Sequence, residues 1–232
     1  MLRHVFILLL TALLFAVFCA LGVWQLERRT WKLDLIAQVE RQLAQSPTPA
    51  PGAEQWPSLG ADDTYRPVKI SGHYLHDQAT LVQAMTRLGS GYWVITPLQT
   101  NAGFAVLVNR GFVDQPHRQD YSRPAGTVTI SGLLRLTEPG GRVLRPNVPA
   151  EDRWYSRDVA AIAQKRGLSG AALAPYFIDA DRQSETAEWP AGGLTVVKFR
   201  NTHLSYALTW FALASLSLLA GGIVLRKRPS GG

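Results

Sequence analysis

The sequence predicts an α+β membrane protein, in which two transmembrane helices bracket a β-rich periplasmic domain with a short helix. Two stretches without a charged residue, 5–24 and 204–225, are each about twenty residues long, which is the length needed to cross a hydrocarbon core of ~30 Å. The segment between them has the size of one domain. It contains short runs of β-branched and aromatic residues bounded by Gly, Pro or Asn, which are typical of strands.

The boundaries and orientation follow from these spans and their charges. We expect four segments: an N-terminal transmembrane helix with a short cytoplasmic start at 1–26, a periplasmic α+β domain at 27–203, a C-terminal transmembrane helix at 204–225, and a basic cytoplasmic tail at 226–232. Arg3 and the basic cluster at 226–228 indicate the cytoplasmic side, where positive residues are retained. Residues 25–29 lack the small side chains of a cleavage site, so the first span is expected to be retained. Because no transit peptide precedes it, we expect a multi-pass protein of the bacterial cell inner membrane.

Composition disfavours several function classes. The net charge of +7 belongs partly to the flanks of the spans, and no run of like charges suggests nucleic-acid binding. A single cysteine, Cys19, rules out a disulfide within the chain and a cysteine zinc cluster. His73 and His76 resemble a metal pair, but positions three apart on a strand point to opposite faces, so a strand histidine and a turn histidine are expected. No nucleophile or phosphate-loop motif is present, and we do not expect an enzyme.

The elements between the spans can be predicted from local patterns. The first helix should continue through 25–45, followed by an irregular proline-rich segment at 46–60. Strands are expected at 68–74, 92–98, 104–113, 128–136, 176–179 and 194–199, with a hairpin loop at 99–103 and a short helix at 157–166 ended by Gly167. We expect a mostly antiparallel sheet or a small open barrel. Asn109-Arg110-Gly111 is expected to form a turn that uses the conformational freedom of Gly111.

Polar and aromatic residues gather at the outer ends of the two spans. His203, Tyr206 and Trp210 lie at i, i+3 and i+7 and share a helix face. On the first helix, Trp24, Arg28 and Trp31 fall on one stripe, and the cation Arg29 lies next to it in the sequence. An interfacial belt of aromatic and basic residues explains most of this set without a ligand.

The belt explains His203 less well, because an ionisable group at the mouth of a span is costly unless it has a partner or a task. An imidazole beside aromatic walls and cations suits a flat apolar ligand that carries acidic groups. Haem is the obvious candidate, with His203 as the axial iron ligand and Arg28 or Arg29 near the propionates. A site without any ligand stays an open alternative at this point.

Five segments, in order along the chain, resemble the surfeit locus protein 1 family. They are 21–32 (LGVWQLERRTWK), 65–68 with Gly72, 91–92 leading to 96–98, 108–113 and 200–211 (RNTHLSYALTWF). Two departures are Phe112, where many members have Trp, and Asp114-Gln115 before Pro116.

The resemblance implies an assembly factor for haem-copper cytochrome c oxidase that transiently binds haem a and assists its insertion into subunit I. It also implies that His203 is the haem ligand, and that haem a synthase and membrane lipid are possible partners. The alternative is a scaffold that never holds haem and binds oxidase or haem synthase subunits through the periplasmic domain.

Overall fold

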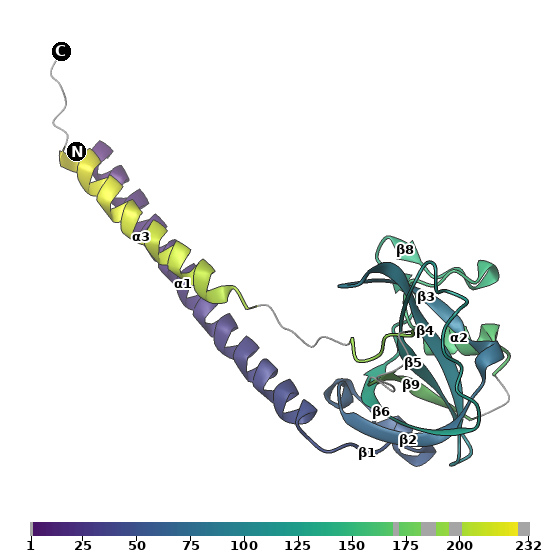
Figure 1. Cartoon of the computed structure of the whole chain (residues 1–232). Coiled ribbons are helices and arrows are strands. Elements are labelled where there is room, and N and C mark those ends of the chain that lie inside the picture. The colour runs from purple at the N-terminus through teal and green to yellow at the C-terminus, as the bar shows by residue number, and fades with distance from the viewer. Residues whose placement is uncertain (1, 169–171, 182–188, 195–200, 227–232) are drawn as a thin grey trace. The chain divides into compact units, whose positions relative to one another are not determined.

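The computed structural model describes residues 2–168, 172–181, 189–194 and 201–226 (Figure 1). The chain divides into two compact units. The helical unit comprises Met1–Glu40 and Val197–Gly232, and the barrel unit comprises Arg41–Val196. Each unit is described by itself.

The helical unit consists of two helices, α1 at Leu2–Leu43 and α3 at His203–Arg226. Both are long and apolar enough to cross a membrane. The predicted continuation of the first helix beyond its apolar run is confirmed, because α1 ends only at Leu43. At 1.5 Å per residue, α1 is roughly 63 Å long, about twice the thickness of a hydrocarbon core.

Small residues form the seam between the two helices. Every seventh residue of α3 is buried: Ala207, Ala214 and Gly221. A Cβ atom at Gly22 of α1 would lie 2.6 Å from the ring of Phe211, and one at Gly221 would lie 2.5 Å from the hydroxyl of Thr11. Because small residues let helix backbones approach closely, the two helices pack directly on each other.

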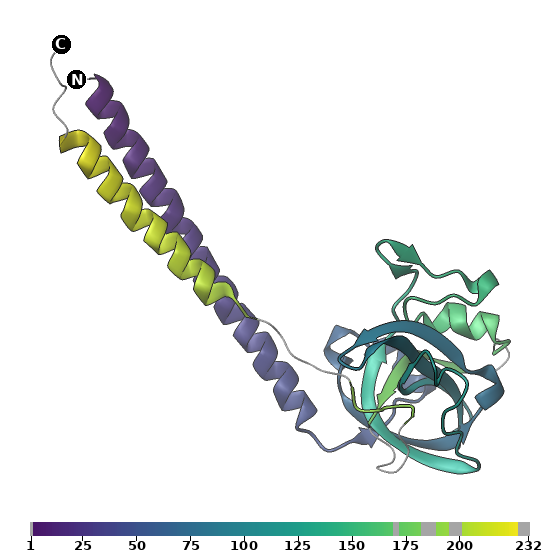
Figure 2. The same ribbon diagram turned by 45° about the horizontal axis from the view of Figure 1, so that its top comes forward.

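The described residues of the barrel unit form nine strands. They are β1 Thr48–Pro49, β2 Pro67–Tyr74, β3 Thr80–Thr86, β4 Gly89–Thr100, β5 Ala105–Asp114, β6 Thr127–Leu136, β7 Gly141–Arg142, β8 Arg145–Pro146 and β9 Leu173–Ala180. Seven of them form a sheet in the order β1-β2-β6-β9-β5-β4-β3, and an additional β2–β4 pairing closes five into a barrel (Figure 2). Within the barrel only β5 and β9 are parallel. The predicted small, mostly antiparallel barrel is confirmed.

Helix α2 at Val159–Lys165 lies on the outside of the barrel. The carboxylate of Asp158 accepts the backbone N–H of Ala161 at 3.1 Å, which caps its first turn. Gly167, with a positive φ of 69°, follows its end. The short helix predicted at 157–166 is therefore confirmed. The part of the unit that the structure describes also has four 3-10 helices: Ala53–Ser58, Ala61–Asp63, His76–Gln78 and Pro149–Glu151.

Two apolar clusters hold the barrel unit together. The first includes Val68, Ile130 and Tyr176 from barrel strands, and the second joins α2 to Trp154 and Phe177. The Tyr176 hydroxyl donates to the carbonyl oxygen of Pro51 at 2.8 Å, which satisfies its one buried polar group. Burial raises the pKa of this phenol. The fully buried tyrosine of the first cluster is thus hydrogen-bonded inside the core.

The expectation of a turn at Asn109-Arg110-Gly111 is wrong. These residues lie inside β5, which runs on to Asp114, and the register against β4 shifts between Trp93 and Ile95. The side-chain oxygen of Asn109 accepts the backbone N–H of Gly111 at 3.2 Å, and this local bond accompanies the bulge. Gly111 has a φ of 134°, and a Cβ there would collide with the carbonyl group of Ala191. The glycine is therefore required by a bulge and a close backbone approach.

Other strands differ from the prediction at the level of whole elements. β3 and the β7–β8 hairpin were not predicted. The irregular segment at 46–60 contains β1 and a 3-10 helix. The strand expected at 194–199 lies outside the described residues except for Leu194, and of the expected tail at 226–232 only Arg226 is described.

Candidate functional site

His203 is the first residue of α3, and local capping places it there. Its backbone N–H donates to the side-chain oxygen of Asn201 at 3.3 Å, and the N–H of Tyr206 donates to the carbonyl of Thr202 at 3.3 Å. Asn and Thr directly before an apolar run are a helix start signal, because their side chains satisfy free N–H groups of the first turn. The imidazole therefore lies at the very end of the apolar helix.

Gln25 of α1 is the partner of that imidazole. Nδ1 of His203 and Oε1 of Gln25 are 2.8 Å apart, and both side chains are half-buried. An amide oxygen only accepts hydrogen bonds, so Nδ1 is the donor in this pair, and in the neutral imidazole Nε2 then carries the lone pair. A hydrogen bond of this kind fixes the tautomer and orientation of histidines that bind metals. The site therefore presents one nitrogen with a free lone pair.

The predicted aromatic residues divide into two groups. Trp210 is half-buried and stacks on Phe18 of α1, with ring centroids 5.8 Å apart and planes 23° apart. Tyr206, by contrast, is 55% exposed, and Trp24 is 50% exposed. His203 and Trp210 thus contact α1, whereas Tyr206 and Trp24 lie largely outside the seam.

The predicted cations lie on α1 beyond the apolar run. The guanidinium of Arg28 stands 4.7 Å from the ring centroid of Trp31, whose side chain is about half exposed. Arg29 is half-buried. Neither arginine forms an ion pair with another described residue. Both charges are therefore available to an acidic group.

Sequence reasoning missed Gln25 as the partner of His203, although it lies in the segment 21–32. The register between α1 and α3 at the seam identifies this partner. Gly22 packs against Phe211 and Phe18 against Trp210. In antiparallel helices, moving outward along α1 means moving toward the start of α3, and this register brings residue 25 beside residue 203.

A second polar cluster lies in the barrel unit and centres on Asp179 of β9, which is 3% exposed. Its carboxylate accepts hydrogen bonds from Asn109 at 2.8 Å, Arg135 at 2.7 Å and Arg157 at 3.1 Å. Arg157 also binds the carboxylate of Glu138, with Nε 3.0 Å from Oε2. Two guanidinium groups thus balance two carboxylates, which indicates a structural role for this ion network.

The network shifts the pKa values of two of its members. Burial alone would raise the pKa of Glu138, but the hydrogen bonds and charge of Arg157 outweigh it and hold that pKa below its ordinary value. Burial would lower the pKa of Arg157, but the charge of Asp179 and the hydrogen bond to Glu138 raise it instead. Both groups are therefore charged at neutral pH.

His73 and His76, two of the three histidines of the barrel unit, belong to different elements. His73 is an exposed residue of β2, and His76 begins a 3-10 helix with Nε2 2.9 Å from the carbonyl oxygen of Pro124. The prediction of a strand histidine and a turn histidine is confirmed. Among the described residues, no three side chains of His, Cys, Asp or Glu are grouped so that they could hold a metal ion.

The fold and the site together define a class of protein: two membrane helices that pack as a pair and carry a small barrel between them in the chain. The model of the SURF1 family matches residues 12–215. The chain therefore belongs to the SURF1 family, in agreement with the resemblance seen in the sequence.

Individual relatives agree along most of the chain. The sequence is 35% identical to Surfeit locus protein 1 of Rattus norvegicus over 230 residues, which cover 90% of this chain and 72% of that protein. It is 35% identical to Surfeit locus protein 1 of Homo sapiens over 216 residues, covering 84% and 69%. It is 34% identical to a SURF1-like protein of Monosiga brevicollis over 225 residues, covering 90% and 83%.

Proposed function

We propose that this protein is an assembly factor for haem-copper cytochrome c oxidase in a bacterial inner membrane, and that it binds haem a and assists its insertion into subunit I. Membership of the SURF1 family supports the role in oxidase assembly. The observation that carries haem binding is the hydrogen bond between His203 and Gln25. In this role haem a is a cargo, and the protein holds and releases it without turnover.

The residues at the outer ends of the helices fit such a cargo. Haem iron takes a neutral imidazole nitrogen as axial ligand, and Nε2 of His203 has the required lone pair. Arg28 and Arg29 supply unpaired guanidinium groups for the two propionates. Trp24, Trp31, Tyr206 and Trp210 provide apolar ring surface for the porphyrin.

The proposed orientation places residues 27–203 in the periplasm and both termini in the cytoplasm. The basic residues Arg3 and Arg226 at the inner ends of the helices support it. Alkaline phosphatase is active only outside the cytoplasm, so a fusion after Ser122 should be active and a fusion at the C-terminus should be inactive. The reverse pattern would overturn the orientation.

The test of haem binding is the haem-to-protein ratio of detergent-purified protein from cells that make haem a. His203→Ala should reduce this ratio and shift the spectrum of any haem that remains. Gln25→Leu should reduce it less, because the ligand stays but loses the acceptor that orients it. His4→Ala, at the opposite end of α1, is the matched control and should equal the parent.

The arginines can be tested in the same assay. Because neighbouring cations can substitute for each other, Arg28→Gln and Arg29→Gln together should lower haem retention more than either change alone. Equal ratios in the single and double variants would mean that both arginines are only interfacial.

The second candidate function is a scaffold that binds oxidase subunits or haem a synthase through the barrel unit and never holds haem. A basic cleft in the barrel unit favours it and is described below. An unchanged haem ratio and spectrum in His203→Ala would remove His203 as the ligand and leave the scaffold as the better explanation.

A further inference from the structure

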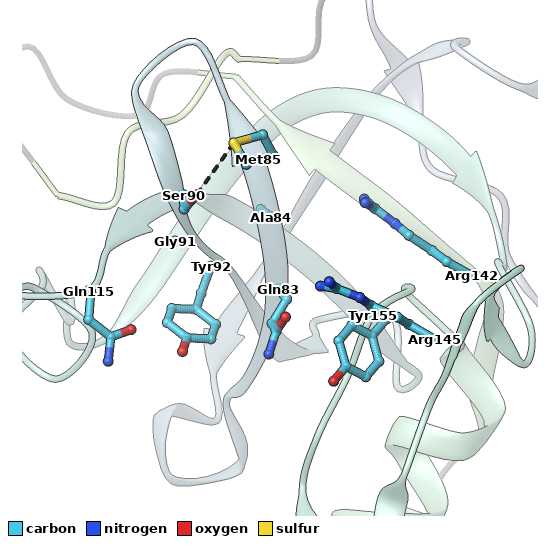
Figure 3. Close-up of a pocket in the computed structure, with 10 residues that line it drawn as sticks. All are labelled: Gln83, Ala84, Met85, Ser90, Gly91, Tyr92, Gln115, Arg142, Arg145 and Tyr155. Carbon is cyan, nitrogen blue, oxygen red and sulfur yellow. Dashed lines mark hydrogen bonds between the residues drawn. The ribbon is translucent and has the colours of Figure 1, made fainter.

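A cleft of about 340 Å³ lies between two hairpins of the barrel unit, β3–β4 and β7–β8 (Figure 3). We call it the hairpin cleft. Its walls include Gln83, Met85, Tyr92, Arg142, Arg145 and Tyr155, and no aspartate or glutamate of the described residues lines it. The cleft is therefore basic and partly aromatic.

Two arginines give the cleft its charge. Arg142 and Arg145 are opposite each other in the register of β7 and β8. Both side chains extend toward the strand that carries Gln83 (Figure 3). The guanidinium of Arg145 lies 5.9 Å from the ring centroid of Tyr155. Neither arginine forms an ion pair with another described residue. Two positive charges thus face the cleft without compensation.

The base of this hairpin is held by hydrogen bonds. The hydroxyl of Ser156, which is buried, accepts from the N–H of Gly141 and from the side-chain amide of Asn147, each at 3.0 Å, and donates to the carbonyl of Glu138 at 2.6 Å. The side-chain oxygen of Asn147 accepts the N–H of Tyr155 at 2.8 Å. The arginines therefore project from a fixed support, which lowers the entropic cost of binding.

The opposite wall of the cleft is an open strand edge. β3 pairs with β4 on one side, and on the other the N–H of Gln83 donates to the carbonyl of Trp154 at 2.8 Å. Backbone groups alternate between the two sides of a strand, so the N–H and C=O of Met85 also face away from β4. Met85 is 73% exposed. Beyond Gln83, the edge of β3 therefore offers the cleft a backbone donor and acceptor that pair with no other described residue.

The tip of the β7–β8 hairpin is apolar. Val143 and Leu144 form its two-residue turn, and both side chains are almost fully exposed. Turns of this kind usually carry Gly, Asn or Asp. Exposed apolar residues beside a basic cleft are typical of a surface that contacts another molecule.

We propose that the hairpin cleft binds an extended, acidic segment of a partner protein. The segment adds to the edge of β3 through the backbone of Met85 and places its carboxylates on Arg142 and Arg145. Addition of a strand to an open edge supplies backbone hydrogen bonds, and the side-chain pockets supply specificity. Arginine, tyrosine and methionine are enriched in protein interfaces.

Two features favour a peptide over a lipid surface. A lipid headgroup satisfies a guanidinium but does not pair with the edge of a strand, whereas a peptide does both. In addition, the cleft lies between two hairpins and is walled on both sides, which suits an extended chain. The proposal does not depend on haem binding, because none of its residues belongs to the helical unit.

The experiment uses the full-length protein in phosphatidylcholine nanodiscs. The probe is a fluorescein-labelled heptapeptide of alternating Val and Glu, and the control peptide has Lys in place of Glu. Binding is measured by fluorescence anisotropy. The acidic peptide should bind and the basic one should not. Arg142→Gln with Arg145→Gln should weaken binding about tenfold, which is the size expected for two exposed charge contacts.

Two matched substitutions make the test specific. Met85→Pro removes a backbone N–H that faces away from β4, together with the side chain that accepts from the hydroxyl of Ser90 at 3.4 Å. Near-ultraviolet circular dichroism should be unchanged and binding should be lost. Met85→Leu, which removes only the sulfur contact, should bind like the parent. Arg87→Gln makes the same charge change on a residue outside the cleft lining and should have no effect. His203→Ala should bind the peptide normally, which separates this proposal from haem binding.

Several outcomes overturn the proposal. Equal binding of both peptides, or normal binding by a folded Met85→Pro variant, excludes strand addition. For the lipid alternative, bimane is attached to Leu144→Cys in a Cys19→Ser background. A blue shift on changing to phosphatidylglycerol nanodiscs, without competition by the peptide, would assign the hairpin to the membrane surface instead.

Discussion

Replacing Asp179 with asparagine should destabilise the barrel unit by about 3 kcal/mol, at the low end of the cost of breaking a buried ion pair. The carboxylate accepts from three donors on separate segments, Asn109, Arg135 and Arg157. The amide keeps one acceptor oxygen but points a donor at a guanidinium, and it leaves the network with an uncompensated positive charge.

The magnitude can be read from thermal unfolding of the detergent-solubilised protein, followed by tryptophan fluorescence. A loss of about 3 kcal/mol corresponds to a midpoint roughly 10 °C lower for a domain of this size. The matched control is Glu151→Gln, which makes the same chemical change in the exposed ion pair with Arg153 and should cost less than about 1 kcal/mol.

If both variants unfold at the parent's temperature, the buried carboxylate with three donors contributes no more to stability than an exposed one, and the predicted loss is refuted. It also fails if Glu151→Gln is the more destabilising change. A selective loss in Asp179→Asn, reversed in part when Arg135→Met removes the excess charge, would establish the network as the source of the stability.

Two further predictions concern the barrel unit. Gly111→Val should lower the amount of folded protein in the membrane, because residue 111 combines a φ of 134° with a close approach to Ala191. The control Gly103→Asn, at a positive φ in open space, should be tolerated. Equal amounts of the two variants would contradict this prediction. Acid should weaken the barrel through Glu138: its folded pKa is lowered, so its contribution is complete above the ordinary value of 4.5 and is lost as the pH falls through the folded pKa. Unfolding at pH 3 and pH 7 should therefore differ less in Glu138→Gln than in the parent, and an equal difference would remove Glu138 as a source.

The strands that could be predicted are those with a strong local pattern. β5 and β6 carry many β-branched and aromatic residues, and both were found from the sequence. β3 was missed because its buried positions are Thr80, Val82 and Ala84, which are small or polar and give little hydrophobic contrast with their neighbours. β7 and β8 have two residues each, which is too short for any periodicity.

The sites show the same division between local and long-range information. Helical spacing placed His203 and Trp210 on one face, because α3 is a single regular helix. The partner of His203 required the register between α1 and α3. The ion network around Asp179 had no local signal at all, since Asn109 and Arg135 reach Asp179 only through the pairing of β9 with β5 and β6. Arg157 reaches it from the segment before α2.

The position of β9 also sets a condition on how the chain is made. This strand lies between β5 and β6 but is synthesised after both, so the barrel cannot close until Ala180 has emerged. Until then β5 and β6 each expose an unpaired edge that invites aggregation. The start of α3 follows 23 residues later, at His203. Closure of the barrel and membrane insertion of the second helix therefore fall in the same short interval of translation. A chain cut before β9 loses the barrel, whereas one cut where the barrel unit ends, at Val196, keeps the barrel and loses α3.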